Sequence, residues 1–193
     1  VNINGGALNL SPASGSTVIY SGRLTGSGSI IKSGAGSIVF NGQHSDFSGQ
    51  VTIQQGTLRL NSLATAITAQ TSSAESRRDA DADSVLSCST VEFDVNGISA
   101  AELKLSDKLI SFSRPVTVNG NTTGSVRFTT RNATNISSDI LLNRNLQIAA
   151  GGGTFSGVIS GPGSITVTHP DPADAQYQLA PITTMNRNNT YTG

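Results

Sequence analysis

The chain lacks tryptophan and has few charged or aromatic side chains. Only 12% of its 193 residues are charged and 5% are aromatic, and 12 basic residues balance 12 acidic ones, for a net charge of zero. No basic stripe with interleaved aromatic rings is present, so the sequence gives little support to nucleic-acid binding. Binding to an anionic membrane surface is equally unsupported.

Cysteine is nearly absent as well. Cys88 stands alone between Ser87 and Ser89, so no disulfide can form within these residues. We interpret Cys88 as a small buried apolar residue, with a reactive thiol or an interchain bridge as the alternatives. One cysteine is compatible with export and also with a cytosolic protein, so it does not decide the compartment.

Small polar residues take the place of the missing types, since the chain has 21 glycines, 27 serines, 21 threonines and 15 asparagines. Short runs of alternating apolar and polar residues lie between Gly-Gly, Asn-Gly, Gly-Ser and Pro-Gly pairs. This alternation is typical of strands with one buried face, and the pairs favour tight turns. Helical spacing is almost absent. The runs include 51–53, 58–60, 91–95, 103–105, 116–118, 126–128, 146–148 and 165–167.

Parts of the segment 22–60 recur at both ends of the chain. VNINGGALNL at 1–10 matches VTIQQGTLRL at 51–60 in its apolar places and its glycine. SGVISGPGSITV at 156–167 matches SGRLTGSGSIIK at 21–32. We therefore predict one complete repeat between two partial copies, in a piece of a longer protein.

Such a polar chain cannot fill a thick globular core, yet its apolar residues are regularly placed, which disfavours disorder. A solenoid meets both conditions. Each coil of roughly 20 residues buries two or three inward side chains and stacks ~4.8 Å from the next coil. We predict an all-β parallel β-helix that spans residues 1–193 as a single segment of a longer rod.

The run GSGSIIKSGAG at 26–36, followed by SIVFNG and DFSGQVTIQQGTLRL, resembles the passenger-associated transport repeat of bacterial autotransporters. That repeat orders a glycine-rich turn, LTKTG, a strand, NTYTG, a strand and GTL. The NTYTG at 189–193 matches the second signature letter for letter. We expect structural roles for the residues that fill these places, which include Lys32, Gly34, Gly36, Gly49, Gly56, Leu58, Leu60 and Gly193.

The resemblance implies a right-handed parallel β-helix that a Gram-negative bacterium exports and then displays or releases at its surface. It also implies a stalk segment of a virulence factor, adhesin or toxin. No run approaches the ~20 apolar residues of a membrane helix, so we expect the signal peptide and the outer-membrane barrel of the same polypeptide to lie outside this fragment. The expected partners are a host-cell receptor or glycan, or other copies of the rod.

Two segments depart from the repeat. We predict that the first leaves the rod as a surface loop or a short helix and that the second is a loop insertion or an irregular coil. The first is 69–84, where six charged residues crowd together. The second is 169–185, which interrupts the last repeat. For the first loop a calcium site at Asp79, Asp81 and Asp83 is an alternative, although Ser84 stands where a calcium loop needs glycine. A protease-sensitive point at Arg77–Arg78 is another.

Patterns typical of enzymes are incomplete in this sequence. His44 and His169 lack a second metal-type ligand at suitable spacing, and the Gly-x-Gly pairs lack the helix that a phosphate site needs. The rival hypothesis is a β-helical polysaccharide lyase or hydrolase, with Glu92 and Asp94 on one strand and Lys104 on a possible next coil. We expect solvated strand charges there instead, and so no catalytic, cofactor-binding or metal residues.

Overall fold

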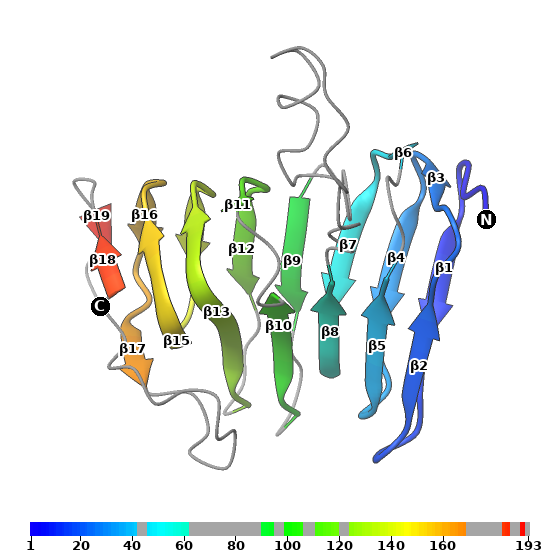
Figure 1. The fold of residues 1–193 in the computed structure, drawn as a ribbon, viewed down its shortest axis with the longest axis horizontal. Coiled ribbons are helices and arrows are strands. Elements are labelled where there is room, and N and C mark those ends of the chain that lie inside the picture. The colour runs from blue at the N-terminus through cyan, green and yellow to red at the C-terminus, as the bar shows by residue number, and fades with distance from the viewer. Residues whose placement is uncertain are drawn as a thin grey trace, which may run out of the picture.

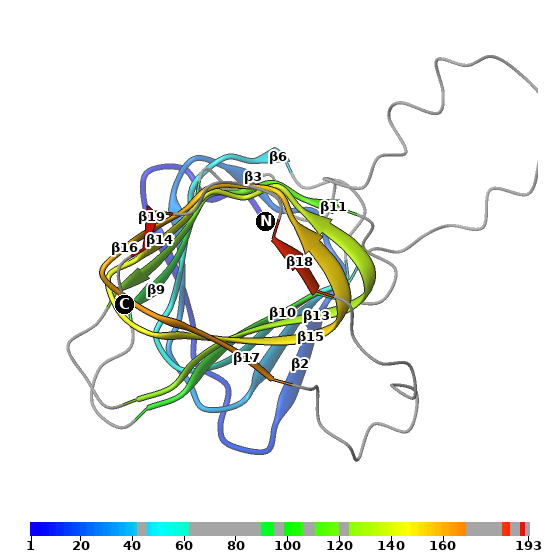
Figure 2. The ribbon, with the colours of Figure 1, turned by 90° about the vertical axis from the view of Figure 1, so that its left-hand side faces the viewer.

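A computed structural model shows the protein as an all-β parallel solenoid, which confirms the predicted fold class. The structure describes residues 1–41, 46–61, 90–94, 99–105, 111–119, 124–168, 183–185 and 190–191, and these contain no helix. Successive coils lie side by side along one axis (Figure 1). Seen down that axis, they wind around a common centre (Figure 2). The right-handed sense of winding stays a prediction.

The first wall of the solenoid is an eight-stranded sheet in which every neighbouring pair is parallel. Each strand pairs with the corresponding strand of the coil before and the coil after, because the chain makes a full circuit between them. The strands, in sheet order, are β1 (Ala7–Leu10), β4 (Ser29–Lys32), β7 (Gln50–Ile53), β9 (Thr90–Asp94), β12 (Val116–Asn119), β14 (Ile140–Leu142), β16 (Ile159–Gly161) and β19 (Thr190–Tyr191).

The second wall is a nine-stranded sheet built in the same way. Its main path is β17 (Ile165–Thr168), β15 (Leu146–Phe155), β13 (Val126–Ile136), β10 (Ala101–Leu105), β8 (Gly56–Leu60), β5 (Ser37–Phe40) and β2 (Thr17–Tyr20). Off this path, β11 (Ser111–Phe112) pairs with β13, and β18 (Thr183–Met185) pairs with β15.

Short strands form a third side in several of the described coils. Near the N-terminus it consists of β3 (Thr25–Gly26) and β6 (Asp46–Phe47), which form a two-stranded sheet. Further along the rod, β11 and β18 pair with the far halves of β13 and β15. The register of β13 against β15 shifts between Arg131 and Thr134, an irregularity of the kind that bends a strand and lets it continue onto another side.

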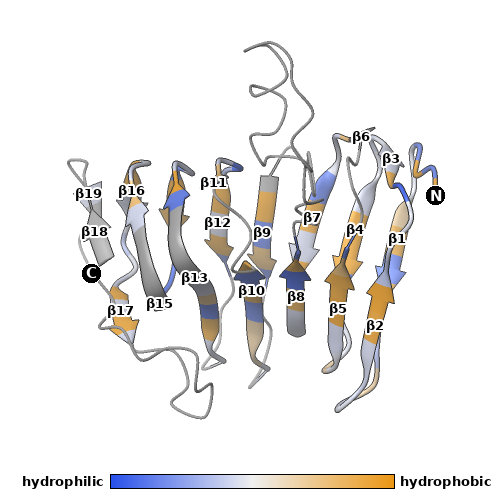
Figure 3. Cartoon of the chain, in the orientation of Figure 1, coloured by the Kyte–Doolittle hydropathy of each residue, from blue (hydrophilic) through white to orange (hydrophobic). Residues whose placement is uncertain are grey.

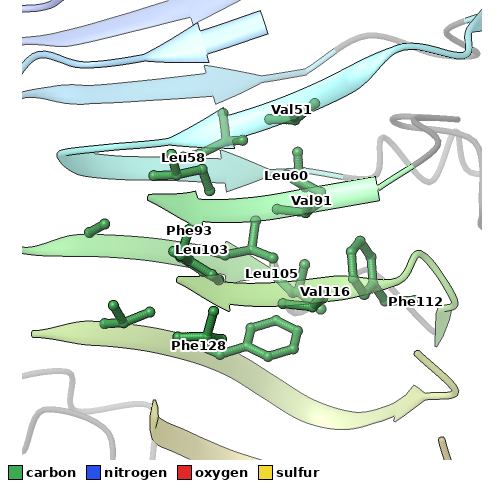
Figure 4. Close-up of a cluster of buried hydrophobic side chains, with 14 of the residues drawn as sticks. Val51, Leu58, Leu60, Val91, Phe93, Leu103, Leu105, Phe112, Val116 and Phe128 are labelled. Carbon is green, nitrogen blue, oxygen red and sulfur yellow. The ribbon is translucent and has the colours of Figure 1, made fainter. Parts of the chain in front are cut away.

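The core is a set of columns of apolar side chains, each column running through successive coils. Hydrophobic and hydrophilic residues alternate along β9 and β10 (Figure 3), so one set faces the centre. Side chains from both walls meet there, as Figure 4 shows. One column of the first wall contains Ile30, Val51, Val91, Val116, Ile140 and Ile159, and one of the second contains Ile38, Leu58, Leu103, Phe128 and Ile148.

The stacking register corrects the predicted alignment of the repeats at both ends. Leu8 pairs with Ile30 in the first wall, whereas its predicted equivalent Leu58 lies in the second wall. Likewise, Ile159 and Ile165 lie in the first and second walls, one strand away from the predicted match to 21–32. Every coil combines glycine turns with alternating apolar residues, so an alignment displaced by one strand matches almost as well as the true one.

The predicted loop 69–84 lies outside the described residues, as do Cys88, His44, His169 and most of the predicted insertion at 169–185. The last three residues of that insertion, Thr183–Met185, form β18 and pair with β15. The insertion therefore ends in a strand of the second sheet.

Candidate functional site

The lysine of the repeat signature lies inside the solenoid. Lys32 ends β4, where the alternation of the strand directs Ile30 and Lys32 inward together. In its column it stacks between Leu10 and Ile53, and its side chain has no exposed surface. A cation therefore occupies a place that neighbouring coils fill with apolar residues.

Backbone carbonyl groups of two successive coils hold this cation. The Nζ of Lys32 donates hydrogen bonds to the carbonyl oxygen of Gln55, at 2.8 Å, and to that of Gly34. Burial lowers the pKa of Lys32 from 10.5 to about 8, because loss of water disfavours the charged form. Lys32 thus ties the turn after its own strand to the turn of the next coil.

Two of the predicted signature glycines, Gly34 and Gly56, lie at the same ammonium group, and Gly36 lies beside Gly56. Gly56 has a φ of 72°, and a Cβ there would lie 2.7 Å from the Nζ of Lys32. The same Cβ would lie 2.4 Å from the carbonyl oxygens of both Gly34 and Gly36. Only glycine fits this place, on grounds of both backbone conformation and space. We call Lys32, Gly34, Gly36 and Gly56 the lysine–glycine cluster.

The other signature residues serve the stacking of coils. A Cβ on Gly49 would lie 1.5 Å from the carbonyl oxygen of Gly28, so this glycine permits two turns to approach closely. Leu58 and Leu60 point into the core and are 0% and 2% exposed. Gly193 lies outside the described residues.

The structure separates the carboxylates of the rival enzyme hypothesis from their predicted base. Glu92 lies on the first wall, where it accepts hydrogen bonds from Gln50 Nε2 at 2.5 Å and Asn119 Nδ2 at 2.6 Å. Lys104 lies on the second wall, opposite Arg59 and Thr129. The side chains that hold Glu92 come from the coils before and after it, so this carboxylate bridges three coils.

A groove that sequence reasoning missed lies on the outer side of the second wall. Its volume is about 370 Å³, and small residues at Gly56, Ala100 and Ser125 line it together with longer polar side chains. The polar side chains form one column across four successive coils, namely Thr57, Glu102, Arg127 and Gln147. The available signal was that each of these residues occupies a polar place of an alternating strand, but nothing in the sequence showed that the four strands are neighbours.

The two charges in this groove are not paired with each other. Glu102 accepts hydrogen bonds from the hydroxyl groups of Thr57, at 3.2 Å, and of Thr129. The Nε of Arg127 is buried and has no hydrogen-bond partner in the described part of the chain. The carboxylate is therefore oriented by neighbouring strands, whereas the guanidinium has an unused donor.

Comparison with protein-family models, with curated proteins and with solved structures finds no match to this chain. The fold is established, and a β-helix is compatible with several functions.

The described residues contain no group of three histidine, cysteine, aspartate or glutamate side chains able to hold a metal ion. The alternative calcium site at Asp79, Asp81 and Asp83 lies outside them. In the same described part of the chain, no helix has the length and apolarity needed to cross a membrane.

Proposed function

We propose that this chain is a structural stalk segment of a surface-displayed or secreted autotransporter passenger, a virulence factor, adhesin or toxin, of a Gram-negative bacterium. The observation that carries the proposal is the lysine–glycine cluster. Lys32, Gly34, Gly36 and Gly56 fill places of the transport-repeat signature, and they lie together where the ammonium group of Lys32 links two coils. Signature residues spread over 25 positions of the sequence thus form one contact that joins two stacked coils.

The architecture also suits a chain that must cross a membrane unfolded and fold afterwards. Neighbouring strands of each wall come from successive coils, so each new coil can fold on the one already formed. A solenoid of this kind needs no contact between distant coils to begin folding. The stalk would present its loops and outer faces to host receptors, glycans or other rods.

The test of the stalk role is the location of the chain in the cells that encode it. Proteinase K added to intact cells should degrade the chain, and an antibody raised against it should label those cells without permeabilisation. A periplasmic protein serves as the control for intact outer membranes. Protection of the chain until the cells are opened, without any released form in the medium, would refute the proposal.

The alternative function is a β-helical carbohydrate-active domain, which a direct assay separates from the stalk role. Under the stalk proposal the purified chain should release no reducing or unsaturated ends from a panel of neutral and acidic polysaccharides. Cleavage by the wild-type chain that is lost in Glu92→Gln and kept in Lys104→Gln would establish the alternative with Glu92 as its catalytic group. Glu92→Gln can keep one of the two hydrogen bonds of Glu92, so loss of folding is not expected to obscure the result.

A further inference from the structure

The groove on the outer side of the second wall crosses the strands and runs along the rod. It extends from Thr57 on β8, through Glu102 and Arg127, to Gln147 on β15. Three intervals of ~4.8 Å between neighbouring strands give a length of about 14 Å. The volume of the groove lies within the usual range of ligand sites, and its course across four strands suits a short piece of an extended polymer.

The lining of the groove indicates a ligand rich in hydrogen-bonding groups. Gln147 at one end can donate and accept, the Thr57 hydroxyl at the other end donates to Glu102 and can still accept, and Glu102 accepts. Among the described residues, no phenylalanine, tyrosine or tryptophan lines the groove, and its apolar surface comes from small residues such as Ala35 and Ala100. A lipid or an aromatic ligand would find little apolar surface to bury, whereas a saccharide carries hydroxyl groups around each ring.

Arg127 narrows the ligand class further. It is the one basic side chain in the groove, and its Nε lacks a partner among the residues that the structure describes. The neighbouring carboxylate of Glu102 is directed to Thr57 and Thr129, so it does not use this donor. The Nε atom itself is buried, but Arg127 as a whole is half-buried and lines the groove, so a ligand would meet the outer part of its guanidinium. A guanidinium matches the two oxygens of a carboxylate in geometry and charge.

We propose that this groove binds an acidic saccharide, with a carboxylate of the ligand on Arg127 and its hydroxyl groups on Glu102, Thr57 and Gln147. The opposite charges of Glu102 and Arg127 give the groove no net charge, so it suits a chain with isolated carboxylates and disfavours a dense polyanion. The binding site goes beyond the stalk role and does not depend on it. The purified chain can be tested wherever the cell places it.

The experiment measures binding of 3′-sialyllactose, trigalacturonate and neutral lactose to the purified chain by NMR titration. We expect both acidic probes to bind at least about tenfold more tightly than lactose, with a shift of the Arg127 Nε–H resonance. Arg127→Gln should lose at least about tenfold in affinity for the acidic probes. The matched control is Lys104→Gln, which removes the same charge from the outer side of the same wall, outside the groove, and should bind as the wild type does.

Several results would overturn the proposal. The first is no binding of either acidic probe, and the second is binding of lactose as tight as that of the acidic probes. The third is a loss of affinity in Lys104→Gln as large as that in Arg127→Gln. The fourth is binding of a triglutamate peptide as tight as that of the acidic saccharides, which would show recognition of charge alone. If Arg127→Gln does not fold, the Arg127 Nε–H resonance of the wild-type chain tests the proposal instead. It must shift when an acidic saccharide is added and stay unchanged with lactose, and any other result contradicts the proposal. A negative result in these binding experiments leaves the protease test of the stalk role unaffected.

Discussion

At the scale of single residues, the main finding is a buried lysine that acts as part of the backbone scaffold. Lys32 occupies a core column, and its ammonium group donates hydrogen bonds to carbonyl oxygens of two coils. The pKa of Lys32 is lowered to about 8 by burial, while the unfolded chain keeps a value near 10.5. Between these values the unfolded chain binds more protons than the folded chain.

This difference predicts that stability rises with pH. The free energy of unfolding should increase by about 2 kcal/mol between about pH 7.5 and about pH 9.5 through Lys32 alone, since each pKa unit corresponds to ~1.4 kcal/mol. In Lys32→Met that increment should disappear, while Lys104→Met should retain it. Urea unfolding of the three proteins at both pH values measures the effect. An unchanged pH dependence in Lys32→Met would contradict the assignment.

Replacement of Gly49 by alanine, which adds one methyl group, is predicted to lower the stability of the fold. A Cβ there would overlap the carbonyl oxygen of Gly28, so Gly49→Ala must push two turns apart. We expect a loss of about 1–3 kcal/mol, typical of overpacking. Gly6→Ala is the matched control, because a Cβ on Gly6 meets nothing within 4 Å, and it should be neutral within about 0.5 kcal/mol. Thermal unfolding of both variants tests the contrast, and equal stability would refute it.

At the scale of elements, each strand contributes its inward residues to columns shared with its neighbours. Leu58 on β8 lies between Ile38 and Leu103 and has no exposed surface. Val18 on β2 belongs to the same column but is 49% exposed, because β2 has a partner on one side only. The position of a strand in the sheet therefore decides what an inward residue contributes.

Truncation of these two residues should show the difference. Leu58→Ala is expected to lower the free energy of unfolding by about 2–5 kcal/mol, because it leaves a cavity in a closed column. Val18→Ala should cost less than about 1 kcal/mol. Chemical denaturation gives both values. Similar costs for the two variants would mean that Leu58 does not face a packed core.

At the scale of the whole molecule, stability follows position along the rod. In both sheets, the described strands of each coil pair only with strands of the neighbouring coils, so an inner coil is stabilised from two sides and an end coil from one. Edge-to-face ring contacts join Phe112, Phe128 and Phe155, with centroids 5.9 and 6.1 Å apart, and a similar contact joins Tyr20 and Phe40 at the N-terminal end.

Hydrogen exchange of the backbone amides should record this gradient. We expect β8, β10 and β13 to exchange slowest, and β2 and β17 to exchange faster by one to several orders of magnitude, since end coils can open locally. Mass spectrometry of peptides from a time course measures it. Uniform protection along the rod would indicate that the chain opens as one cooperative unit and would contradict this prediction.

Local patterns were enough to predict much of the fold. Alternation in the runs 91–95 and 103–105 identified most of β9 and part of β10 with their inward residues, because the two faces of a strand differ in polarity. The signature residues Lys32, Gly34 and Gly56 could likewise be selected as structural. The same patterns failed to place Leu8 and Ile165 in their walls, because each coil offers nearly the same pattern of apolar residues and glycines as the next.

The amino-acid sequence by itself determined that this chain is a parallel β-solenoid with turns built on glycine, because backbone conformation and strand polarity are local properties. Tertiary structure alone decided which strands are neighbours. It thereby brought Gln55 to the ammonium group of Lys32 and set Glu102 beside Arg127 on the outer side of the second wall. These contacts depend on the number of residues in each coil, and that number is fixed by how whole coils pack on one another.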